Sequence, residues 1–452
     1  MTGLPDRVLV ANRGEIAVRV IRACRDLGIE AVAVYSEADA DALHVALADE
    51  AVEIGKAQAK ASYLRPEAVV EAAVSTGCGV LHPGYGFLAE DPRLPTACAE
   101  AGVAFAGPPA DVMAAVGDKV TARAAAERAG VPVVPGTGRL EDPEAAQAAA
   151  EEIGFPVLLK ASAGGGGRGI RRVDDPGELK TAFSRASAEA EAAFGDGGLF
   201  VEKCIERPRH VEVQVLADTH GNVIHLYERD CSVQRRKQKL IEEAPAPNLD
   251  ASLREGLCDA ALALAREVGY INAGTAEFIV DPVGGTFHFL ELNARIQVEH
   301  GVTEMLCGVD LVCEQLRVAA GLPLSVAQED VVARGCAIEL RINAEDPEQK
   351  FMPSPGEITG WHAPSGPGVR VDAGVETGRK VVPFYDSMVA KVMVWGADRE
   401  QALARARRAL DELTVEGIKT TRDLQRSLLD WDEFAEGRAT TESLEAYLGA
   451  AA

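Results

Sequence analysis

The most regular pattern of polar and apolar positions in the chain lies in residues 286–300, TFHFLELNARIQVEH. Its first residues favour a β-strand, and from residue 290 polar and apolar residues alternate without exception. Successive side chains of an extended chain point to opposite faces. A half-buried strand alternates in the same way, but its solvent face rarely holds such a mixture of charges and amides. One face is therefore expected to carry Glu291, Asn293, Arg295, Gln297 and Glu299.

The residues before this run predict a β-hairpin. TAEFIV at 275–280 and TFHFLEL at 286–292 flank the turn sequence DPVGG. Pairing that is symmetric about Gly284 would place Glu277 opposite Glu291, with Cβ atoms about 4.5–5.5 Å apart, where like charges are destabilising. A divalent cation would remove this conflict, and the amide oxygen of Asn293 would add a third hard ligand of the kind that Mg²⁺ takes beside nucleotide phosphates. The alternative is a solvated strand face with a slipped register.

The N-terminal residues predict a doubly wound α/β unit. Residues 7–35 read as strand, loop, helix and strand, and the loop NRGE lacks the GxGxxG pattern of dinucleotide-binding folds. A helix at 66–76 leads into a strand and a glycine-rich turn within 79–87. The run HPGYGFL would place backbone amides and Tyr85 at the carboxyl end of a strand, where open α/β sheets bind ligands. A plain tight turn is the alternative.

A second glycine-rich segment lies at residues 157–173, VLLKASAGGGGRGIRRV. Four consecutive glycines let backbone N–H groups approach an anion closely, and Lys160 and Arg168 add positive charge. A Walker A loop ends in GK[ST] and leads into a helix, whereas this loop joins two predicted strands. The pattern therefore favours a flap over phosphates, and the alternative is a flexible surface hairpin.

Several isolated polar residues are further candidates. Lys119, near the start of a predicted helix, could contact a phosphate or be solvated. The strand edge after Glu202 could read an adenine edge, and His210 could lie near a ribose or phosphate, although a lone histidine is more often structural. Arg341 lies on a predicted strand and could meet a second substrate, although a structural ion pair is commoner.

A basic cluster at residues 228–239, ERDCSVQRRKQK, stands out in an otherwise acidic chain. Such a cluster usually faces anions in a cleft. The alternative is a solvated loop that pairs with acidic neighbours. Its cationic residues are Arg229, Arg235, Arg236, Lys237 and Lys239.

Composition narrows the class of protein. The chain has 452 residues, of which 47% are hydrophobic, so we expect two to four packed domains. A net charge of −24 argues against nucleic acids and anionic membranes as partners. Nine cysteines without a CxxC pair predict reduced thiols in a cytoplasmic enzyme. The first residues lack a signal-peptide layout, and no apolar run approaches the roughly 20 residues of a membrane helix.

Taken together, the motifs resemble the biotin carboxylase family of the ATP-grasp superfamily. They follow the family order from residue 8 to about residue 390, and ELNARIQVEH with RINAED separates this family from other ATP-grasp ligases. The motifs are VLVANRGEIAVRVIRAC, LHPGYGFLAE, GDK, LLKASAGGGGRG, ERPRHVEVQVLAD, ERDCSVQRRKQKLIEEAPAP, FLELNARIQVEH, VTEML, GVDLVCEQL and ELRINAED.

The resemblance implies an α/β and α+β architecture with an ATP-grasp fold. A Rossmann-like pre-ATP-grasp domain would span residues 1–116, and the ATP-grasp domain would span 117–333 with a mobile lid lobe at about 132–203. A C-terminal α+β lobe would span 334–446.

The resemblance also implies a reaction: ATP-dependent carboxylation of biotin with bicarbonate through carboxyphosphate, as the first half-reaction of an acetyl- or propionyl-CoA-type carboxylase. Biotin would be a substrate attached to a biotin carboxyl carrier protein, and two Mg²⁺ or Mn²⁺ ions would accompany ATP. The other implied partners are a second copy in a homodimer and a carboxyltransferase subunit. The chain has no Met-Lys-Met biotinylation site, so we expect a stand-alone subunit or a fragment without its carrier domain.

Residue roles follow from the same resemblance. The implied ATP contacts are Lys119, Lys160, Gly165, Gly166, Gly167, Glu202, Lys203, Cys204, Ile205, His210, Gln234, Lys237, Glu277 and Glu291. The implied metal ligands are Glu277, Glu291 and Asn293. Bicarbonate would be held by Lys239, Arg295, Gln297 and the backbone of Val298. Glu299 would be the base, assisted by Arg295 and Lys239, and Arg341 would stabilise the biotin enolate, with Tyr85 also near biotin.

Three positions depart from the family pattern without removing a chemical group. Lys237 stands where histidine or asparagine is common, which would alter ribose contacts. Gly301 replaces a proline, which would loosen the loop after Glu299, and Ala163 replaces the first of five glycines. Two other functions stay open at this point: an ATP-grasp ligase with another acceptor, and an idle subunit that only organises a carboxylase complex.

Overall fold

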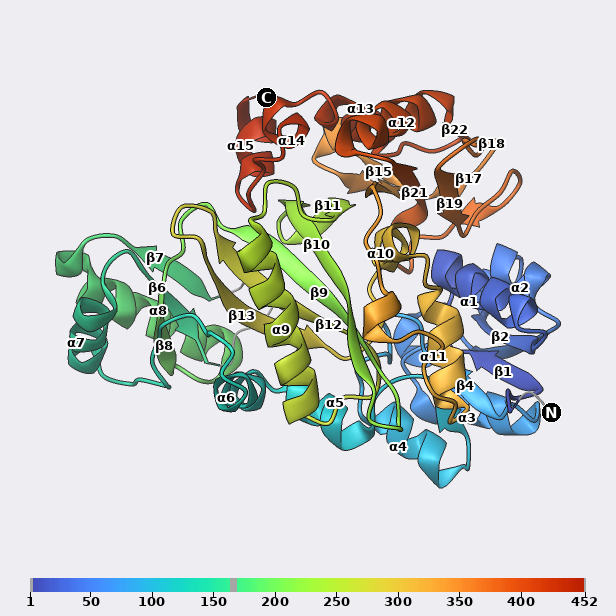
Figure 1. Cartoon of the computed structure of the whole chain (residues 1–452), viewed down its shortest axis with the longest axis horizontal. Coiled ribbons are helices and arrows are strands. Elements are labelled where there is room, and N and C mark those ends of the chain that lie inside the picture. Colours follow the sequence, from blue (N-terminus) through green and yellow to red (C-terminus); the bar gives the residue numbers. More distant parts are fainter. Residues whose placement is uncertain (1–2, 163–168, 451–452) are drawn as a thin grey trace.

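The computed structural model describes residues 3–162 and 169–450. Its N-terminal part is a parallel sheet in the order β3-β2-β1-β4-β5, with helices on both faces (Figure 1). The strand from Val8 to Val10 is fully buried because this sheet is covered on both faces. The predicted doubly wound unit is confirmed. Its elements are β1 Arg7–Val10, α1 Gly14–Asp26, β2 Glu30–Ser36, α2 Leu43–Leu47, β3 Glu50–Gly55, α3 Pro66–Ser75, β4 Val80–His82, α4 Arg93–Glu100 and β5 Ala104–Phe105.

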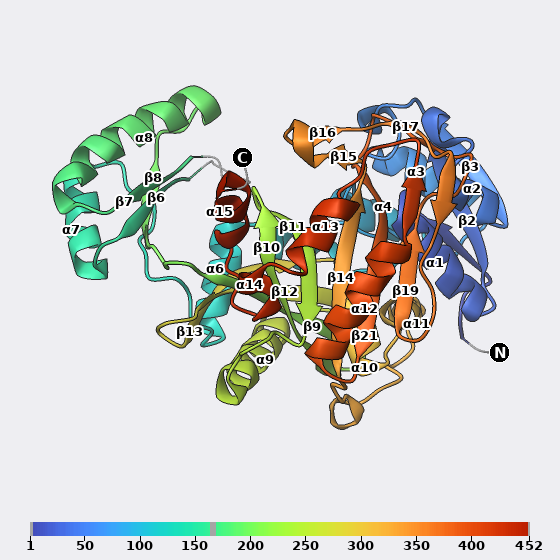
Figure 2. The same cartoon turned by 90° about the horizontal axis from the view of Figure 1, so that it is seen from above.

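An antiparallel sheet of eight strands forms the centre of the molecule, in the order β13-β12-β9-β10-β11-β14-β21-β19. It runs without a break across the predicted boundary at 333/334, because β11 pairs directly with β14 (Figure 2). The ATP-grasp and C-terminal parts therefore share one sheet. Its strands are β9 Arg209–Ala217, β10 Val223–Arg235, β11 Gln238–Ala244, β12 Asn272–Asp281, β13 Thr286–Asn293, β14 Cys336–Asn343, β19 Val369–Ala373 and β21 Met388–Gly396.

Helices cover this sheet in two separate cores. α9 packs with α5 and α6 over the β9–β12–β13 end, and α12 with α13 covers the β14–β21 end. The helices are α5 Ala110–Gly117, α6 Lys119–Arg128, α9 Ala251–Glu267, α10 His300–Cys307, α11 Leu311–Ala319, α12 Arg399–Glu412, α13 Arg422–Leu428, α14 Asp432–Ala435 and α15 Ser443–Ala450. Three two-stranded sheets complete the C-terminal part: β15 Glu345–Asp346 with β16 Met352–Pro353, β17 Gly356–Glu357 with β20 Lys380–Val381, and β18 Gly360–His362 with β22 Thr414–Glu416.

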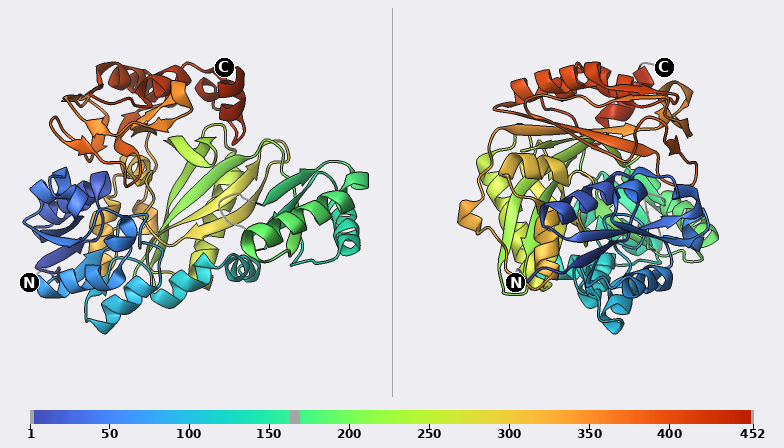
Figure 3. Two further views of the ribbon diagram at one scale, coloured as in Figure 1. Left: turned by 180° about the vertical axis from the view of Figure 1, so that it is seen from behind. Right: turned by 90° about the vertical axis from the view of Figure 1, so that its right-hand side faces the viewer.

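The predicted lid lobe is a small body at one end of the molecule (Figure 3). It has its own sheet, β7-β6-β8, and its own apolar core. Lys160 pairs with Ile170 across β6 and β7, so the glycine-rich segment does connect two antiparallel strands. Ala163, Gly165, Gly166, Gly167 and Arg168 lie outside the described residues. The elements of this lobe are α7 Pro143–Ile153, β6 Val157–Ala161, β7 Ile170–Val173, α8 Leu179–Phe194 and β8 Leu199–Lys203.

The hairpin of β12 and β13 has the predicted pair, since Glu277 lies opposite Glu291. On the turn side the register differs by one, because Phe278 pairs with Phe289 and Leu290 is the extra residue of a bulge.

The predicted extended run beyond this hairpin is wrong, since β13 ends at Asn293 and the chain bends before α10 begins at His300. The cause is tertiary packing. Ala294 still packs in the core beneath α9, whereas Ile296 is buried in a different core, among residues of β1 and α1. The chain therefore leaves the sheet to cross between two cores.

All nine cysteines lie in the described residues and are free, as the prediction of reduced thiols requires. Within residues 3–162 and 169–450, no helix is both long and apolar enough to cross a membrane.

Candidate active site

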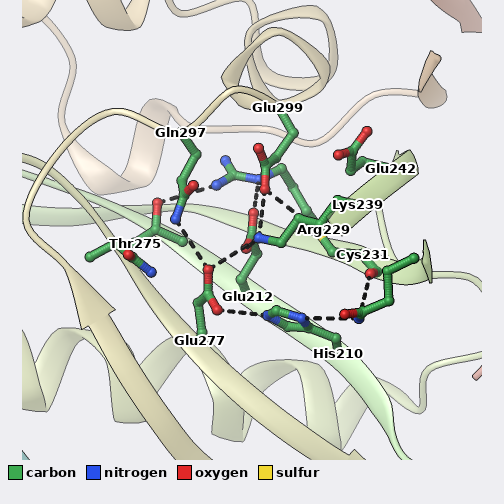
Figure 4. A network of polar contacts seen from close by, with 12 residues as sticks. His210, Glu212, Arg229, Cys231, Lys239, Glu242, Thr275, Glu277, Gln297 and Glu299 are labelled. Atoms are coloured by element: carbon green, nitrogen blue, oxygen red, sulfur yellow. Dashed lines mark hydrogen bonds and ion pairs between the residues drawn. The ribbon is translucent and has the colours of Figure 1, made fainter. Parts of the chain in front are cut away.

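Lys239 is the centre of a buried group of charges. Its side chain extends from β11, and its Nζ lies 2.6 Å from Glu212 Oε2, 2.7 Å from Glu299 Oε1 and 3.1 Å from Glu277 Oε1 (Figure 4). These carboxylates come from β9, from the turn before α10 and from β12, so four segments meet at one ammonium group. All three glutamates are buried, and one cation cannot balance three carboxylates.

Two further residues supply the missing positive charge. Arg229, fully buried on β10, donates from Nε to Glu212 Oε1 at 2.6 Å and from Nη1 to Thr303 at 3.0 Å. His210 Nε2 lies 2.8 Å from Glu277 Oε2. Although burial disfavours the imidazolium, the Glu277 carboxylate holds the pKa of His210 above its ordinary value.

Glu299 is held between two cations. Its Oε2 lies 3.0 Å from Nη2 of Arg341 on β14, opposite the contact with Lys239. Burial alone would raise the pKa of this carboxyl group, but Lys239, Arg341 and Arg229 hold the pKa well below its usual range. Glu299 is therefore a carboxylate at neutral pH.

The remaining polar residues of the alternating run converge on the same place although the strand has ended. Arg295 donates from Nη1 to Gln297 Oε1 at 2.8 Å, and Gln297 donates to Glu277 Oε1 at 3.1 Å. Nε of Arg295 lies 3.0 Å from Glu90 Oε2, in the N-terminal part. The predicted grouping of polar side chains is thus present. It is produced by hydrogen bonds across the bend after Asn293 and not by one face of an extended strand.

Two groups of side chains near Lys239 have the spacing of metal ligands. Glu212, Cys231 and Glu299 lie close enough to share an ion, as do His210, Glu212 and Glu277, but the ammonium group of Lys239 already contacts the carboxylates of both sets. The pair of Glu277 and Glu291 differs in its second member, because Lys239 also contacts Glu277 but Glu291 forms no ion pair among the described residues. The two are ladder partners, and burial and then Glu277 raise the pKa of Glu291. Asn293, two residues on, has a buried amide nitrogen without a hydrogen-bond partner among the described residues. This oxygen-rich set fits Mg²⁺ or Mn²⁺.

Comparison with known proteins identifies the family. Three family models match: the biotin carboxylase N-terminal domain over residues 5–113, the ATP-binding domain of the carbamoyl-phosphate synthase L chain over 118–327, and the biotin carboxylase C-terminal domain over 339–446. The sequence is 53% identical to biotin carboxylase 1 of Bacillus subtilis over 442 residues, which are 98% of each chain. The chain belongs to the biotin carboxylase family. A pyruvate carboxylase subunit of Methanothermobacter thermautotrophicus is 52% identical over 98% of this chain and 90% of its own length.

Solved structures agree with this assignment. The biotin carboxylase domain dimer of Hydrogenobacter thermophilus 2-oxoglutarate carboxylase, in complex with MgADP, ADP and bicarbonate, superposes with a TM-score of 0.90 at 48% identity over 98% of each chain. The ATP-grasp fold that the motifs imply is confirmed. As a biotin carboxylase, the chain is an ATP-dependent ligase that carboxylates biotin with bicarbonate, the first half-reaction of biotin-dependent carboxylases.

The residues implied for nucleotide binding come from the lid lobe, from the central sheet and from α6. Lys160 forms an ion pair with Glu202, and Lys119 and Lys237 are exposed. Burial and then the charges of Lys160 and Lys119 lower the pKa of Lys237, so the three lysines share one region. His210 and Gln234 adjoin through Nδ1 and Nε2 at 3.5 Å.

The implied adenine edge at residues 202–205 is only partly available. The N–H groups of Lys203 and Cys204 already donate to the carbonyls of Pro135 and Pro156. The Lys203 side chain donates to the carbonyls of Gly154 and Phe155, so it is turned away from a nucleotide. The contact of this edge with adenine therefore stays a prediction.

The basic run 228–239 does not act as one surface. Arg229 is a buried partner of Glu212, and Arg235 stacks over the ring of Phe351 at 3.7 Å. Arg229 and Lys239 are the residues of the run that contact the carboxylate cluster, while Lys237 stands at the tip of the β10–β11 hairpin with a positive φ of 67°. The expectation that the whole run faces anions is wrong because Arg235 packs on Phe351 and the chain turns at Arg236 and Lys237, both of which have a positive φ.

Gly301 does not loosen a loop, as its replacement of proline suggested, because it is buried in the first turn of α10. A Cβ atom there would lie 2.1 Å from Sδ of Met393, so the Met393 side chain fills the space that a larger residue would need.

Sequence reasoning missed four residues of this site: Glu212, Glu242, Glu15 and Lys391. Glu242 is fully buried and forms an ion pair with Arg341. Glu212 alternates with valines in β9, a pattern that also fits a strand with one solvated face, and Glu242 stands beside Glu243 without alternation. The local sequence therefore gives no signal that either acid is buried.

Proposed function

We propose that Glu299 is the base that deprotonates bicarbonate and that Lys239, Arg295, Gln297 and the backbone at Val298 bind this anion. The observation that carries the proposal is the placement of Glu299, a fully buried carboxylate between the ammonium of Lys239 and the guanidinium of Arg341.

Binding of bicarbonate would change the basicity of Glu299. The anion competes with Glu299 for Lys239, and the loss of one cationic neighbour raises the pKa of the carboxyl group. Glu299 then takes the bicarbonate proton, and the carbonate oxygen attacks the γ-phosphorus of ATP as ADP leaves. Loss of CO₂ from the resulting carboxyphosphate frees phosphate, which accepts the ureido proton of biotin while the ureido nitrogen bonds to CO₂. Arg341 would stabilise the enolate form of biotin, with Tyr85 beside it.

Divalent cations belong to the pair of carboxylates in the β12–β13 hairpin. Glu277 and Glu291 would hold the two Mg²⁺ or Mn²⁺ ions, with Asn293 as a further ligand. When bound, these ions neutralise charge on the ATP phosphates. The protein side chains orient the carboxylates: His210 fixes one oxygen of Glu277, and Gln297 and Lys239 fix the other.

Substitution of Glu291 tests the metal assignment. Glu291→Gln is expected to raise the Mg²⁺ concentration for half-maximal ADP release by about tenfold, which corresponds to about 1.4 kcal/mol, because an amide is a weaker ligand than a carboxylate. The control is Glu255→Gln on the exposed side of α9, which should leave the titration unchanged. An unaltered Mg²⁺ requirement in Glu291→Gln would remove this residue from the metal site.

The lid lobe is proposed to close over the nucleotide. Lys119, Lys160, Lys237, His210 and Gln234 would contact ATP together with the glycine-rich segment. The Lys160–Glu202 ion pair supports this proposal, because a phosphate could replace the carboxylate as the partner of Lys160.

The remaining proposals concern partners. We propose as partners a biotin carboxyl carrier protein and a carboxyltransferase subunit, with a homodimer as the assembly and the cytoplasm as the location. Relatives at 53% and 52% identity bear the names of different enzymes, a biotin carboxylase and a pyruvate carboxylase. We propose an acetyl- or propionyl-CoA-type carboxylase, and the acceptor is chosen by the carboxyltransferase.

The experiment that tests the function is ADP release from Mg²⁺, ATP and bicarbonate, with and without free biotin. Biotin-stimulated release is the expected result. The assay is then repeated with a biotinylated carrier protein in place of free biotin. The proposal would be contradicted if the protein bound ATP tightly but neither form of biotin stimulated ADP release.

A further inference from the structure

A second buried cation lies directly beside Arg341 in the sheet. Lys391 on β21 is the ladder partner of Arg341 on β14, and 0% of its surface is exposed. Its Nζ donates to the backbone carbonyl of Val298 at 2.6 Å. Two paired cations thus hold two consecutive residues, since Lys391 binds Val298 and Arg341 binds the side chain of Glu299.

The contact reaches the peptide bond that carries the proposed base. The carbonyl of Val298 and the nitrogen of Glu299 belong to one planar unit, so a donor that fixes the carbonyl also fixes the direction in which the Glu299 side chain leaves the backbone. An ammonium–carbonyl hydrogen bond is charge-assisted, and it is stronger in a buried site than in water.

Lys391 is itself oriented by the N-terminal part of the chain. Glu15 on α1, only 3% exposed, has Oε1 at 3.6 Å from Nζ of Lys391 and also accepts a hydrogen bond from the hydroxyl of Tyr85. Two other acids lie nearby. Asp372 is engaged by Arg370 Nη2 at 2.6 Å, and Glu339 on β14 is fully buried, with no hydrogen-bond partner for its carboxylate among the described residues. α1, α10 and β21 meet at this place (Figure 1).

We propose that Lys391 is a positioning residue for the carboxylation reaction. Its ammonium group fixes the orientation of the Val298–Glu299 peptide, and Glu15 is its counter-ion. The proposal rests on the assignment of Glu299 as the base. Glu15 also binds Tyr85, which is proposed to lie near biotin. Lys391 therefore connects Tyr85, through Glu15, with Val298, whose backbone is proposed to bind bicarbonate. If Lys391 served only as an ion-pair partner of Glu15, its ammonium group would not need to donate to the carbonyl of Val298 as well.

The test is Lys391→Met, which keeps the length of the side chain and removes its charge. We expect kcat for bicarbonate-dependent ADP release to fall about 100-fold, because a displacement of about 1 Å at the reacting groups has an effect of this size. The KM for ATP should stay within about twofold. Arg399→Met is the matched control. Arg399 on α12 pairs with Glu243 on β11 at 2.7 Å, so its loss should lower the urea midpoint and leave kcat unchanged.

A second variant covers the case in which Lys391→Met does not fold. Glu15→Gln keeps an oxygen for the Tyr85 hydroxyl and removes the counter-ion, and kcat should fall by about tenfold, which corresponds to about 1.4 kcal/mol. A folded Lys391→Met or Glu15→Gln enzyme with kcat within twofold of wild type would overturn the proposal. Failure of the base assignment is recognised separately, because Glu299→Gln would then retain activity.

Discussion

Glu299→Gln is expected to lower bicarbonate-dependent ADP release by about 10³-fold while ATP binding stays close to that of the wild type. The amide has the size of the carboxylate but cannot take the bicarbonate proton, and general base catalysis contributes about 10²–10⁴-fold. ATP binding should persist because the lysines implied for the phosphates do not contact this side chain. The measurements are steady-state ADP release with bicarbonate and a calorimetric titration with a non-hydrolysable ATP analogue.

The control for this prediction is Glu314→Gln on α11. Glu314 is buried and accepts hydrogen bonds from Ser325, far from Lys239, so it reports the effect of removing a buried carboxylate alone. Its kcat should match that of the wild type. Near-normal bicarbonate-dependent turnover in Glu299→Gln would defeat the assignment of the base.

Lys239→Met is expected both to abolish turnover and to destabilise the fold. The substitution leaves Glu212, Glu277 and Glu299 buried with too little positive charge, and breaking a buried ion pair in this way costs about 3–5 kcal/mol. Urea unfolding at pH 7 measures this loss. Lys380→Met, on the exposed strand β20, should change the unfolding free energy by less than about 0.5 kcal/mol.

The sign of the pH dependence distinguishes charge imbalance from lost packing. In the wild type the pKa values of Glu277 and Glu299 are lowered, so their contribution to stability is complete above the unfolded pKa of about 4.3 and is lost as pH falls below it. Without Lys239 the pKa values of these carboxyl groups rise. As pH falls, their protonation removes the excess negative charge in the folded variant and reduces its loss of stability. The difference in unfolding free energy should therefore narrow between pH 7 and pH 5, whereas a packing defect would leave it constant.

The hairpin shows how much of this site local sequence can determine. The turn DPVGG and the alternation of polar and apolar residues were enough to place Glu277 opposite Glu291. The pairing near the turn is displaced by one residue from the predicted register, and the bulge at Leu290 restores the predicted register at Glu277 and Glu291. The bend after Asn293 could not be predicted, because Ile296 is drawn into a core formed by residues near the start of the chain.

Long-range partners were beyond sequence reasoning for the same reason. The sequences of β9 and β11 reveal neither that Glu212 and Glu242 are buried nor that Lys239 and Arg341 pair with them. Lys391 and Glu15 stand at opposite ends of the chain. Glu15 lies within one of the family motifs, but nothing in the local sequence pairs it with Lys391.

The sheet shared by the ATP-grasp and C-terminal parts limits how such a chain can be recombined. A cut at residue 333 would separate β11 from β14 and give each fragment a bare strand edge, open to pairing with other chains. It would also leave Glu242 on one fragment and its guanidinium partner, Arg341, on the other. Related enzymes can therefore exchange these two parts only as a unit. The lid lobe, which closes its own sheet and core, is the segment that can be replaced by itself.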